Sequence, residues 1–354
     1  MSIDINKLVR KNIRDLLPYS SARDEYTGTG AVLMDANENP FNEPQNRYPD
    51  PLQTELKKKL AGLKGVQSAQ IFVGNGSDEA IDLLFRIFCE PGKENVVSIS
   101  PTYGMYKVCA DINNIEVKKA LLNEDFSLNT EALLQACDQN TKLLFICTPN
   151  NPTSNSFDPD DMLELAAKLD CIVVVDEAYI DFSERESLLS EVVNYPNLVV
   201  LQTLSKAWGL AGIRLGMAFS SPEIIRLMNN VKYPYNVNRL TLDFAANALN
   251  NEQQKADWVS MILEERKAMI KKLEMYRFVQ KVYPSDANFI LLKVKNPRQI
   301  YNFLVGERII VRDRSTTELC EGALRITIGS PEENSKLNNA LMHYQRKYVE
   351  SCEI

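Results

Sequence analysis

The sequence predicts an α/β protein: a large domain with a mostly parallel central sheet covered by helices, followed by a smaller α+β domain. Two observations predict this class. Between about residues 71 and 220, short apolar runs alternate with segments of helical periodicity. After about residue 235, a long charged helix precedes alternating strands and a final helix. We therefore expect an N-terminal arm at 1–45, the large domain at 46–240 and the small domain at 241–354.

Six short, mainly apolar runs are the expected strands of the large sheet. The helix after the first strand is clearly periodic, because Ile81, Leu84 and Phe85 share one face. Ser77 stands where the N-cap of that helix is expected. Active sites of such sheets lie beyond the carboxyl ends of the strands. The six runs are Ile71–Val73, Asn95–Ile99, Leu143–Ile146, Cys171–Val175, Leu198–Leu201 and Met217–Phe219.

The small domain is expected to contain three helices and two strands. Its last helix begins at Ser330-Pro331-Glu332-Glu333, a capping box with proline at the first helical position, and continues through His343. The other expected elements are the helices Glu252–Met275 and Arg298–Val305 and the strands Phe289–Lys293 and Leu324–Ile328.

Composition excludes several classes of function. The 354 residues include 40 Lys and Arg against 47 Asp and Glu, a net charge of −7 that disfavours nucleic-acid binding. No apolar run is long enough to span a membrane, no secretory signal is visible, and the seven cysteines are scattered without a C-x-x-C pair. We therefore expect a cytoplasmic protein. A single histidine, His343, argues against a His-based metal site or a Ser/His/Asp triad, and no metal is expected.

Two motifs point to a bound anion and a reactive amine. The run Gly74-Asn75-Gly76-Ser77-Asp78-Glu79 leads from a strand into a helix, where backbone N–H groups bind phosphate, although the dinucleotide pattern G-x-G-x-x-G is absent. The run from Thr203 to Arg214 places Lys206 after a strand, beside hydroxyls and an arginine. A lysine there suits a nucleophile next to an anion site; the alternative is an ordinary surface charge.

Two further motifs follow neighbouring strands. Asp176 and Tyr179 end a strand that is too apolar to be exposed, so the carboxylate needs a cation or hydrogen-bond donors; a structural ion pair is the alternative. The run Thr148-Pro149-Asn150-Asn151-Pro152-Thr153 forms a rigid turn that presents a side-chain amide, which by itself indicates only a turn.

Taken in order, with the aromatic loop Pro101-Thr102-Tyr103, these motifs resemble the fold-type-I aminotransferases that use pyridoxal 5′-phosphate (PLP), over almost the whole chain. A closer resemblance is to the histidinol-phosphate aminotransferase family. It rests on four stretches: Asp35–Phe41, Asn46–Asp50, Ile310–Arg314 and Leu324–Gly329.

The resemblance implies roles for the residues around the cofactor ring. Lys206 would carry the PLP aldehyde as a Schiff base and then move the substrate proton, and Asp176 would keep the pyridine nitrogen protonated. Asn151 and Tyr179 would bind the phenolate oxygen, and Tyr103 would stack on the ring.

The resemblance also implies a phosphate site and a shared dimer site. Tyr48 would reach the cofactor phosphate of the neighbouring subunit in a homodimer. Within one chain, the phosphate would be held by Ser77, Asp78, Thr203, Ser205 and Arg214.

For the substrates, the resemblance implies transfer of the amino group from L-histidinol phosphate to 2-oxoglutarate, giving imidazole-acetol phosphate and glutamate in histidine biosynthesis. Arg325 would bind the α-carboxylate of glutamate. Arg312, with Tyr19 and Asn37, would bind the phosphate of histidinol phosphate. Without the resemblance, both arginines would be interpreted as surface charges. Ser154 departs from the family, which usually has glycine there; the substitution constrains the turn if this position requires a positive φ.

Other functions remain open at this point. An aminotransferase for aromatic amino acids, or an amino-acid-phosphate decarboxylase of the same branch, would share the general motifs. A PLP-binding regulatory module would need a basic DNA-binding segment ahead of the fold, and the acidic chain with its short arm argues against one. A degenerate structural homologue is disfavoured because every type of cofactor contact is present.

Overall fold

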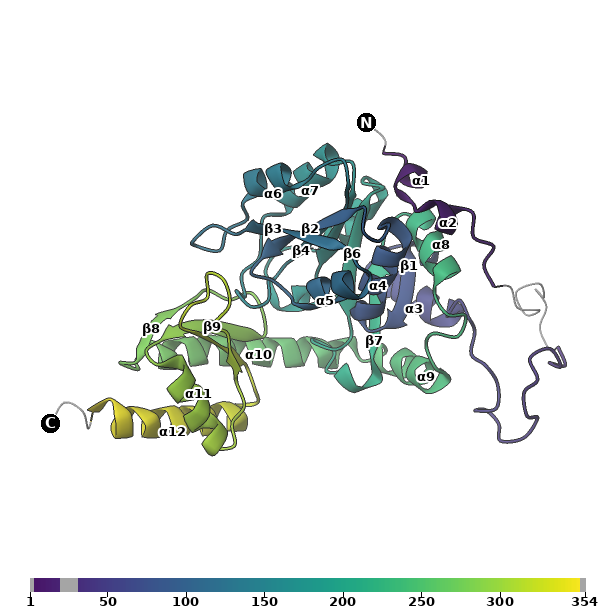
Figure 1. The fold of residues 1–354 in the computed structure, drawn as a ribbon. Helices are drawn as coiled ribbons and strands as arrows, with labels where there is room; N and C mark the ends of the chain where they lie inside the picture. The colour runs from purple at the N-terminus through teal and green to yellow at the C-terminus, as the bar shows by residue number, and fades with distance from the viewer. Residues whose placement is uncertain (1–2, 20–30, 351–354) are drawn as a thin grey trace.

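The structure, a computed structural model, describes residues 3–19 and 31–350. A seven-stranded sheet forms the centre of the larger part of the molecule and a four-stranded sheet that of the smaller part (Figure 1). β7 is antiparallel to both of its neighbours, and the other strands run in one direction. In spatial order the large sheet contains β1 (Ile71–Asn75), β7 (Leu215–Phe219), β6 (Leu198–Thr203), β5 (Ile172–Asp176), β4 (Thr141–Cys147), β2 (Asn95–Ser100) and β3 (Glu116–Leu121).

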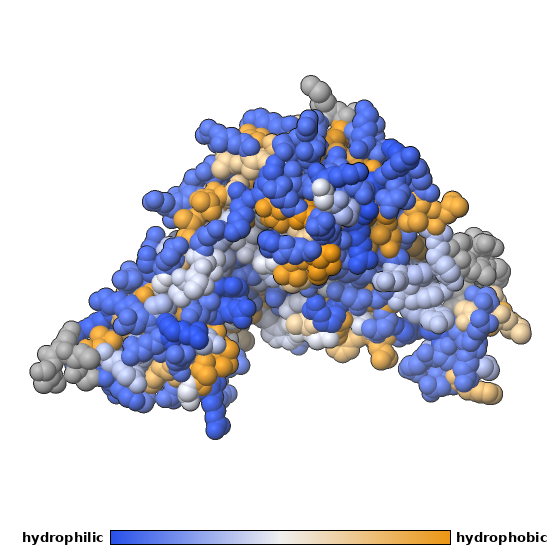
Figure 2. All heavy atoms as spheres, in the orientation of Figure 1, coloured by the Kyte–Doolittle hydropathy of each residue, from blue (hydrophilic) through white to orange (hydrophobic). Residues whose placement is uncertain are grey.

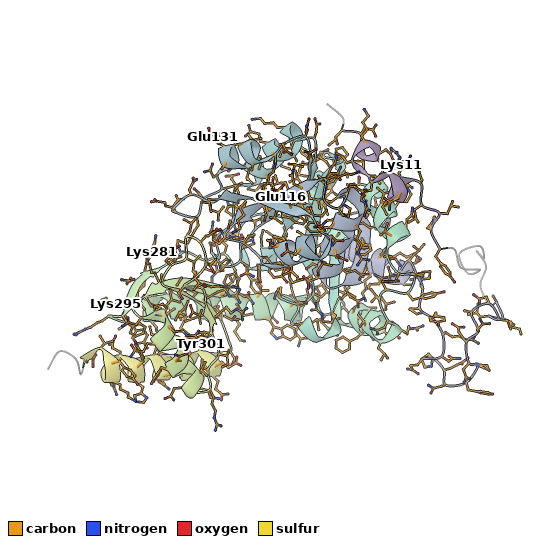
Figure 3. All side chains as sticks on the ribbon, viewed as in Figure 1. Lys11, Glu116, Glu131, Lys281, Lys295 and Tyr301 are labelled. Carbon is orange, nitrogen blue, oxygen red and sulfur yellow. The ribbon has the colours of Figure 1, made fainter. Side chains whose placement is uncertain are left out.

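All six strands expected for this sheet are present, each with bounds within two residues of the expected ones. The seventh, β3, was not expected. It is an edge strand in which only Ala120 is buried, so it has no apolar run to reveal it. Glu116, at its start, is exposed (Figure 3).

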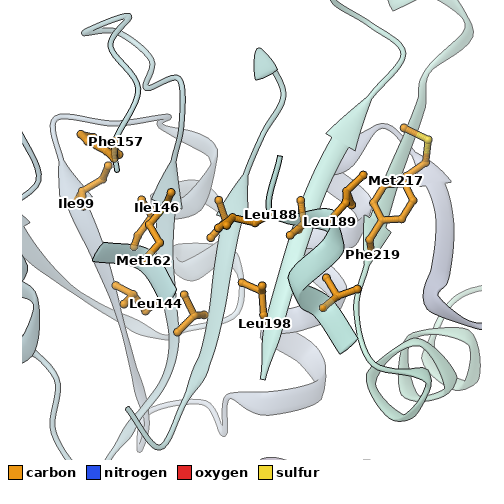
Figure 4. Packing of buried hydrophobic residues seen from close by; sticks show 14 of the residues in the cluster. Ile99, Leu144, Ile146, Phe157, Met162, Leu188, Leu189, Leu198, Met217 and Phe219 are labelled. Atoms are coloured by element: carbon orange, nitrogen blue, oxygen red, sulfur yellow. The ribbon is translucent and has the colours of Figure 1, made fainter. Parts of the chain in front are cut away.

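Helices cover both faces of the large sheet, as expected for parallel strands. Alternate residues of one strand enter different cores: Val173 and Val175 of β5 pack in one cluster, and Ile172 and Val174 in the other. Figure 4 shows part of the first cluster, including Leu198. The helices of this part are α1 (Ile5–Leu8), α2 (Lys11–Arg14), α3 (Thr54–Lys64), α4 (Ser77–Phe88), α5 (Met105–Ile112), α6 (Thr130–Ala136), α7 (Pro159–Lys168), α8 (Pro222–Val231) and α9 (Arg239–Ala248), with the 3₁₀ turns η1 (Ser68–Gln70), η2 (Ile180–Phe182), η3 (Leu188–Val193) and η4 (Ala211–Ile213).

One local prediction was wrong: Ser77 is not the N-cap of α4 but its first residue. The N-cap is Gly76, whose φ of 74° lies in the left-handed region that favours glycine. As a result the chain turns sharply between β1 and α4, and the first N–H groups of the helix are left without a side-chain cap.

The smaller part is an antiparallel sheet packed on helices, with strand order β10-β11-β9-β8. The expected capping box is confirmed: Glu333 N donates to Ser330 Oγ (3.3 Å) and Ser330 N to Glu333 Oε2 (2.8 Å). The expected helices and strands are all present, and two short strands, β8 and β10, were missed. The elements are α10 (Glu252–Leu273), β8 (Val279–Val282), β9 (Phe289–Val294), α11 (Pro297–Gly306), β10 (Arg312–Asp313), β11 (Ala323–Thr327) and α12 (Pro331–Tyr348).

Residues 31–53 contain neither helix nor strand and extend away from the large sheet (Figure 1). On the face shown in Figure 2, hydrophilic residues predominate, with smaller apolar areas between them. Within residues 3–19 and 31–350, no helix has the length and apolarity needed to cross a membrane. The same residues include no group of three or more His, Cys, Asp or Glu that could hold a metal ion.

Candidate active site

A cavity of about 130 Å³ lies at the carboxyl ends of β4, β5 and β6. Three strand ends contribute side chains to it, because neighbouring parallel strands end at the same edge of the sheet. The β1–α4 turn and the loop after β6 complete the wall. Motifs that are more than 100 residues apart in the sequence therefore meet in one place. The lining residues are Gly76, Ser77, Asp78, Tyr103, Cys147, Asp176, Ala178, Tyr179, Thr203, Ser205, Lys206, Ala211 and Arg214.

Asp176, at the end of β5, is only 3% exposed. The Tyr106 hydroxyl donates to its Oδ2 (2.7 Å), and the Ala178 N–H donates to its Oδ1 (3.1 Å). Burial raises the pKa of Asp176, whereas these two hydrogen bonds act to lower it. The carboxylate is thus fixed in direction and would be stabilised further by a cationic N–H donor in the cavity.

Lys206 lies in the loop after β6, with its Nζ 5.4 Å from the centre of the Tyr179 ring. Partial burial lowers the pKa of Lys206, and the positive charge of Arg325 lowers it further; Asp176 acts in the opposite direction. A lowered pKa increases the fraction of neutral amine near neutral pH. The lysine is therefore suited to attack a carbonyl carbon.

The first turn of α4 and the loop after β6 lie side by side and present groups that could hold an anion. Thr203 Oγ1 lies 3.0 Å from Ser205 Oγ, and Arg214 is held beside the turn by an ion pair with Asp78 (3.5 Å). Uncapped N–H groups and the helix dipole attract a phosphate at such a turn. Gly216 allows the close approach: a Cβ there would lie 2.1 Å from the Ser77 nitrogen.

A chain of polar contacts links the cavity to the smaller part of the molecule. Arg325 of β11 donates to Asn151 Oδ1 (2.5 Å), and Asn151 Nδ2 donates to the Tyr179 hydroxyl (3.5 Å). On the other side, the Tyr103 hydroxyl donates to Asp78 Oδ1 (3.1 Å). Arg325 thus presents a cation next to Lys206 and the phenol of Tyr179.

Six of the site residues expected from the sequence do not line this cavity. Asn151 and Arg325 are connected to Tyr179 by the hydrogen bonds described above, and the other four, Tyr48, Asn37, Tyr19 and Arg312, lie farther out. Tyr48 stacks on Tyr235, with ring centroids 4.5 Å apart, and lines a separate cavity of about 670 Å³ together with Asn37. Tyr19 is 71% exposed, at the edge of the described residues. Arg312 is exposed on β10. The chain alone brings together most of the residues expected around the cofactor, but neither Arg312 nor the residues expected from the arm.

Sequence reasoning missed Tyr106. Its ring is fully buried between Phe145 and Tyr103, and buried aromatic residues at helical spacing usually belong to the core. The signal for it was its hydroxyl: a buried tyrosine three residues after Tyr103 needs a hydrogen-bond partner, and the strand-end carboxylate of Asp176 is that partner.

The departure at Ser154 has a structural consequence. Its φ is 69°, so a non-glycine residue occupies the left-handed region, which costs about 1–2 kcal/mol. Its hydroxyl donates to Thr153 O (2.5 Å) and lies 3.1 Å from Pro284 O, a hydrogen bond that joins the turn to the segment before β9. Glycine could not make this bond, which offsets part of the strain.

The donor set specifies the kind of ligand that fits. The N–H groups of the α4 turn suit an anion such as a phosphate. The amine of Lys206 suits a carbonyl carbon, and the carboxylate of Asp176 suits a protonated ring nitrogen. PLP has all three groups. The residues lining the cavity therefore fit this cofactor.

Comparison with known proteins agrees with this chemistry. The family aminotransferase class I and II matches residues 28–341. The histidinol-phosphate aminotransferase of Parabacteroides distasonis is 56% identical over 338 residues, which cover 96% of this chain and 98% of that protein. The histidinol-phosphate aminotransferase of Bacteroides fragilis is 52% identical over 342 residues, which cover 96% of this chain and 99% of that protein.

Solved structures show the same fold. The histidinol-phosphate aminotransferase from Clostridium acetobutylicum superimposes with a TM-score of 0.79 at 24% identity, covering 85% of this chain and 91% of that one. The histidinol-phosphate aminotransferase from Sinorhizobium meliloti, in complex with pyridoxal-5′-phosphate, superimposes with a TM-score of 0.78 at 22% identity. The match covers 86% of this chain and 84% of that one. The resemblance found in the sequence is confirmed: this chain belongs to the class I and II aminotransferase family, in its histidinol-phosphate aminotransferase branch.

Proposed function

We propose that this chain uses PLP to transfer the amino group of L-histidinol phosphate to 2-oxoglutarate, giving imidazole-acetol phosphate and glutamate in histidine biosynthesis. The observation that carries this proposal is that Lys206, Asp176 and the first turn of α4 line one cavity. The choice of substrates is supported by relatives of 56% and 52% identity that are named histidinol-phosphate aminotransferase.

The chain's own residues would hold the cofactor at both ends. Asp176 would accept a hydrogen bond from the ring N–H, and Tyr103 would pack against the ring. Tyr179 and Asn151 would contact the ring oxygen. When bound, PLP supplies an aldehyde that joins amino groups and a ring that accepts the electron pair released at the substrate α-carbon. The phosphate would be held by Ser77, Asp78, Thr203, Ser205 and Arg214.

Lys206 would carry the proton transfers. In the first half of the reaction, its neutral Nζ accepts the α-proton of the amino donor. In the second half, its protonated Nζ returns a proton to the α-carbon derived from the keto acid. The lowered pKa of Lys206 suits both steps, since a general base works best with a pKa near the operating pH.

Arginines would bind the substrate anions. Arg325, beside Tyr179 and Asn151, is placed for a carboxylate near the reacting carbon. Arg312, with Tyr19 and Asn37, would serve the phosphate end. Since Tyr19 and Asn37 lie outside this chain's cavity, we propose that the arm, including Tyr48, completes the site of a second subunit in a cytoplasmic homodimer. The proposed domain boundaries remain 1–45, 46–240 and 241–354.

A competition between amino donors tests the function. The purified holoenzyme is given 2-oxoglutarate with histidinol phosphate, phenylalanine or threonine phosphate, and glutamate formation is measured together with the visible spectrum. We expect the highest kcat/KM with histidinol phosphate. A clear preference for phenylalanine, or release of carbon dioxide from threonine phosphate, would refute the substrate assignment and favour one of the alternatives.

A further inference from the structure

Three arginines share one face of the β10–β11 hairpin. Arg312 lies directly opposite Arg325 in the antiparallel register, and Arg314 continues the ladder by donating its N–H to Ala323 O (2.9 Å). Side chains two residues apart on a strand point to the same face, so Arg314 projects on the same side as Arg312. Ala323 is buried in a core cluster that includes the large sheet. The shared face is therefore turned toward the large domain.

Asp313, the acidic residue of β10, lies on the opposite face of the hairpin. Asp313 accepts hydrogen bonds from Ser315 N (2.9 Å) and Ser315 Oγ (2.6 Å) and pairs with Arg298 Nη1 at 3.7 Å. It lies opposite Leu324, which is buried in the core of the small domain. Asp313 is thus directed away from the arginine face and does not neutralise it.

A second acidic residue near this face, Glu318, is also engaged elsewhere. Glu318, in the loop between β10 and β11, accepts hydrogen bonds from Ser100 Oγ (2.5 Å) and Lys119 Nζ (2.9 Å) of the large domain. Within the described residues, neither Arg312 nor Arg314 forms an ion pair, and the buried Nε atoms of Arg314 and Arg325 lack a hydrogen-bond partner. Among the described residues, the three arginines of this face therefore form no ion pair with a carboxylate.

The surroundings place Arg314 close to the active site. Burial lowers the pKa of Arg314, and the neighbouring charges of Arg325 and Arg312 lower it further, while Cys320 and Tyr179 oppose this effect. The register puts Arg314 on the same face as Arg325, which donates to Asn151, and Asn151 in turn contacts Tyr179 of the cavity. Guanidinium groups stay protonated in proteins, so the cluster requires an anion with several acceptor oxygens.

We propose that Arg314 is a specificity-determining residue that binds the phosphate of the amino donor together with Arg312. This inference rests on the proposed function, and it gives a role to a residue that the resemblance included in the stretch Ile310–Arg314 without assigning it one. Arg325 remains at the carboxylate position, held by Asn151. The planar fork of Arg314 supplies two parallel N–H donors, which match a phosphate monoester better than they match a neutral hydroxyl.

The test compares phosphorylated and unphosphorylated donors. In Arg314→Gln, kcat/KM for histidinol phosphate should fall on the order of 10- to 100-fold, the loss expected for hydrogen bonds to a charged group. The value for histidinol, which lacks the phosphate, should stay within about twofold, so the preference for the phosphorylated donor falls by the same factor. KM for 2-oxoglutarate should not change. The matched control is Arg298→Gln, on the opposite side of the hairpin, which should keep the wild-type preference.

A second readout does not depend on turnover. Calorimetric titration of the PLP-loaded protein with inorganic phosphate should show weaker binding in Arg314→Gln than in wild type or Arg298→Gln. Arg314→Lys, which keeps the charge without the fork, should lie between wild type and Arg314→Gln in both experiments and is the variant to use if the glutamine variant unfolds.

The outcomes separate the two proposals. Equal losses for histidinol phosphate and histidinol, or a loss confined to 2-oxoglutarate, would overturn the role of Arg314 and leave the proposed function intact. A wild-type enzyme without any preference for histidinol phosphate over histidinol would instead contradict the proposed function itself.

Discussion

Replacing Gly216 by alanine tests the anion site directly. A Cβ at this position would lie 2.1 Å from the Ser77 nitrogen and 2.3 Å from the Gly76 carbonyl carbon, whereas ordinary contacts begin at 3.4 Å. The neighbouring atoms are backbone, so they cannot rotate away, and the first turn of α4 must retreat by about 1 Å. A hydrogen bond of ~2.9 Å to a phosphate oxygen would then exceed 3.5 Å and be lost.

The expected magnitude follows from the number of bonds lost. Each hydrogen bond to a charged group contributes about 1.5–3 kcal/mol, so the loss of one bond weakens PLP binding roughly 10- to 100-fold. The assay is titration of the apoprotein with PLP, followed by absorbance. Gly212→Ala is the matched control, since no heavy atom lies within 4 Å of its added Cβ.

Pyridoxal without the phosphate distinguishes a local effect from misfolding. Gly216→Ala should bind pyridoxal about as well as wild type does, because only the phosphate contacts are disturbed. The reasoning would be refuted if Gly216→Ala bound PLP as tightly as the Gly212→Ala control, or if it lost PLP and pyridoxal affinity to the same extent.

Two further predictions concern Asp176 and Lys206. Tyr106→Phe removes the hydroxyl that donates to Asp176, and we expect the rate of the half-reaction with glutamate to fall about 10- to 100-fold in single-turnover kinetics; an unchanged rate would contradict this role. In the apoprotein, the reaction of Lys206 with an aldehyde should increase with pH and reach half its maximum below pH 10.5, because the pKa of Lys206 is lowered. Arg325→Gln should shift that midpoint upward and Asp176→Asn downward; shifts in the reverse directions would contradict the electrostatic account.

The fold was largely predictable because its buried strands are apolar. Runs such as Ile172–Asp176 are enclosed on both faces, so hydrophobicity alone marks them. The edge strand β3 and the two-residue β10 gain their structure from pairing with neighbours, which leaves no local pattern. The N-cap at Gly76 was missed because serine is the usual cap residue. The turn at Gly76 packs closely against Gly216, a contact between distant parts of the chain that no local pattern reveals.

The candidate site was predictable where a motif ends a strand. Asp176, Lys206 and the β1–α4 turn meet because parallel strands end at one edge, a rule that the sequence pattern already implies. Tyr106 and Arg314 could not be placed in this way. From the sequence, Tyr106 is interpreted as an ordinary core residue, and only the structure shows its hydrogen bond to Asp176. The position of Arg314 on the arginine face follows from the strand register that sets Arg312 opposite Arg325.

The central claim is that Lys206 is the lysine that joins PLP. Borohydride reduction of the holoenzyme, followed by proteolysis and mass spectrometry, tests it directly, because reduction fixes the cofactor permanently to the amine that holds it. We expect the added pyridoxyl mass on the peptide containing Lys206 and on no other lysine peptide, and its complete loss in Lys206→Ala. Labelling of a different lysine, or a protein that takes up no PLP and acquires no label, would contradict the account.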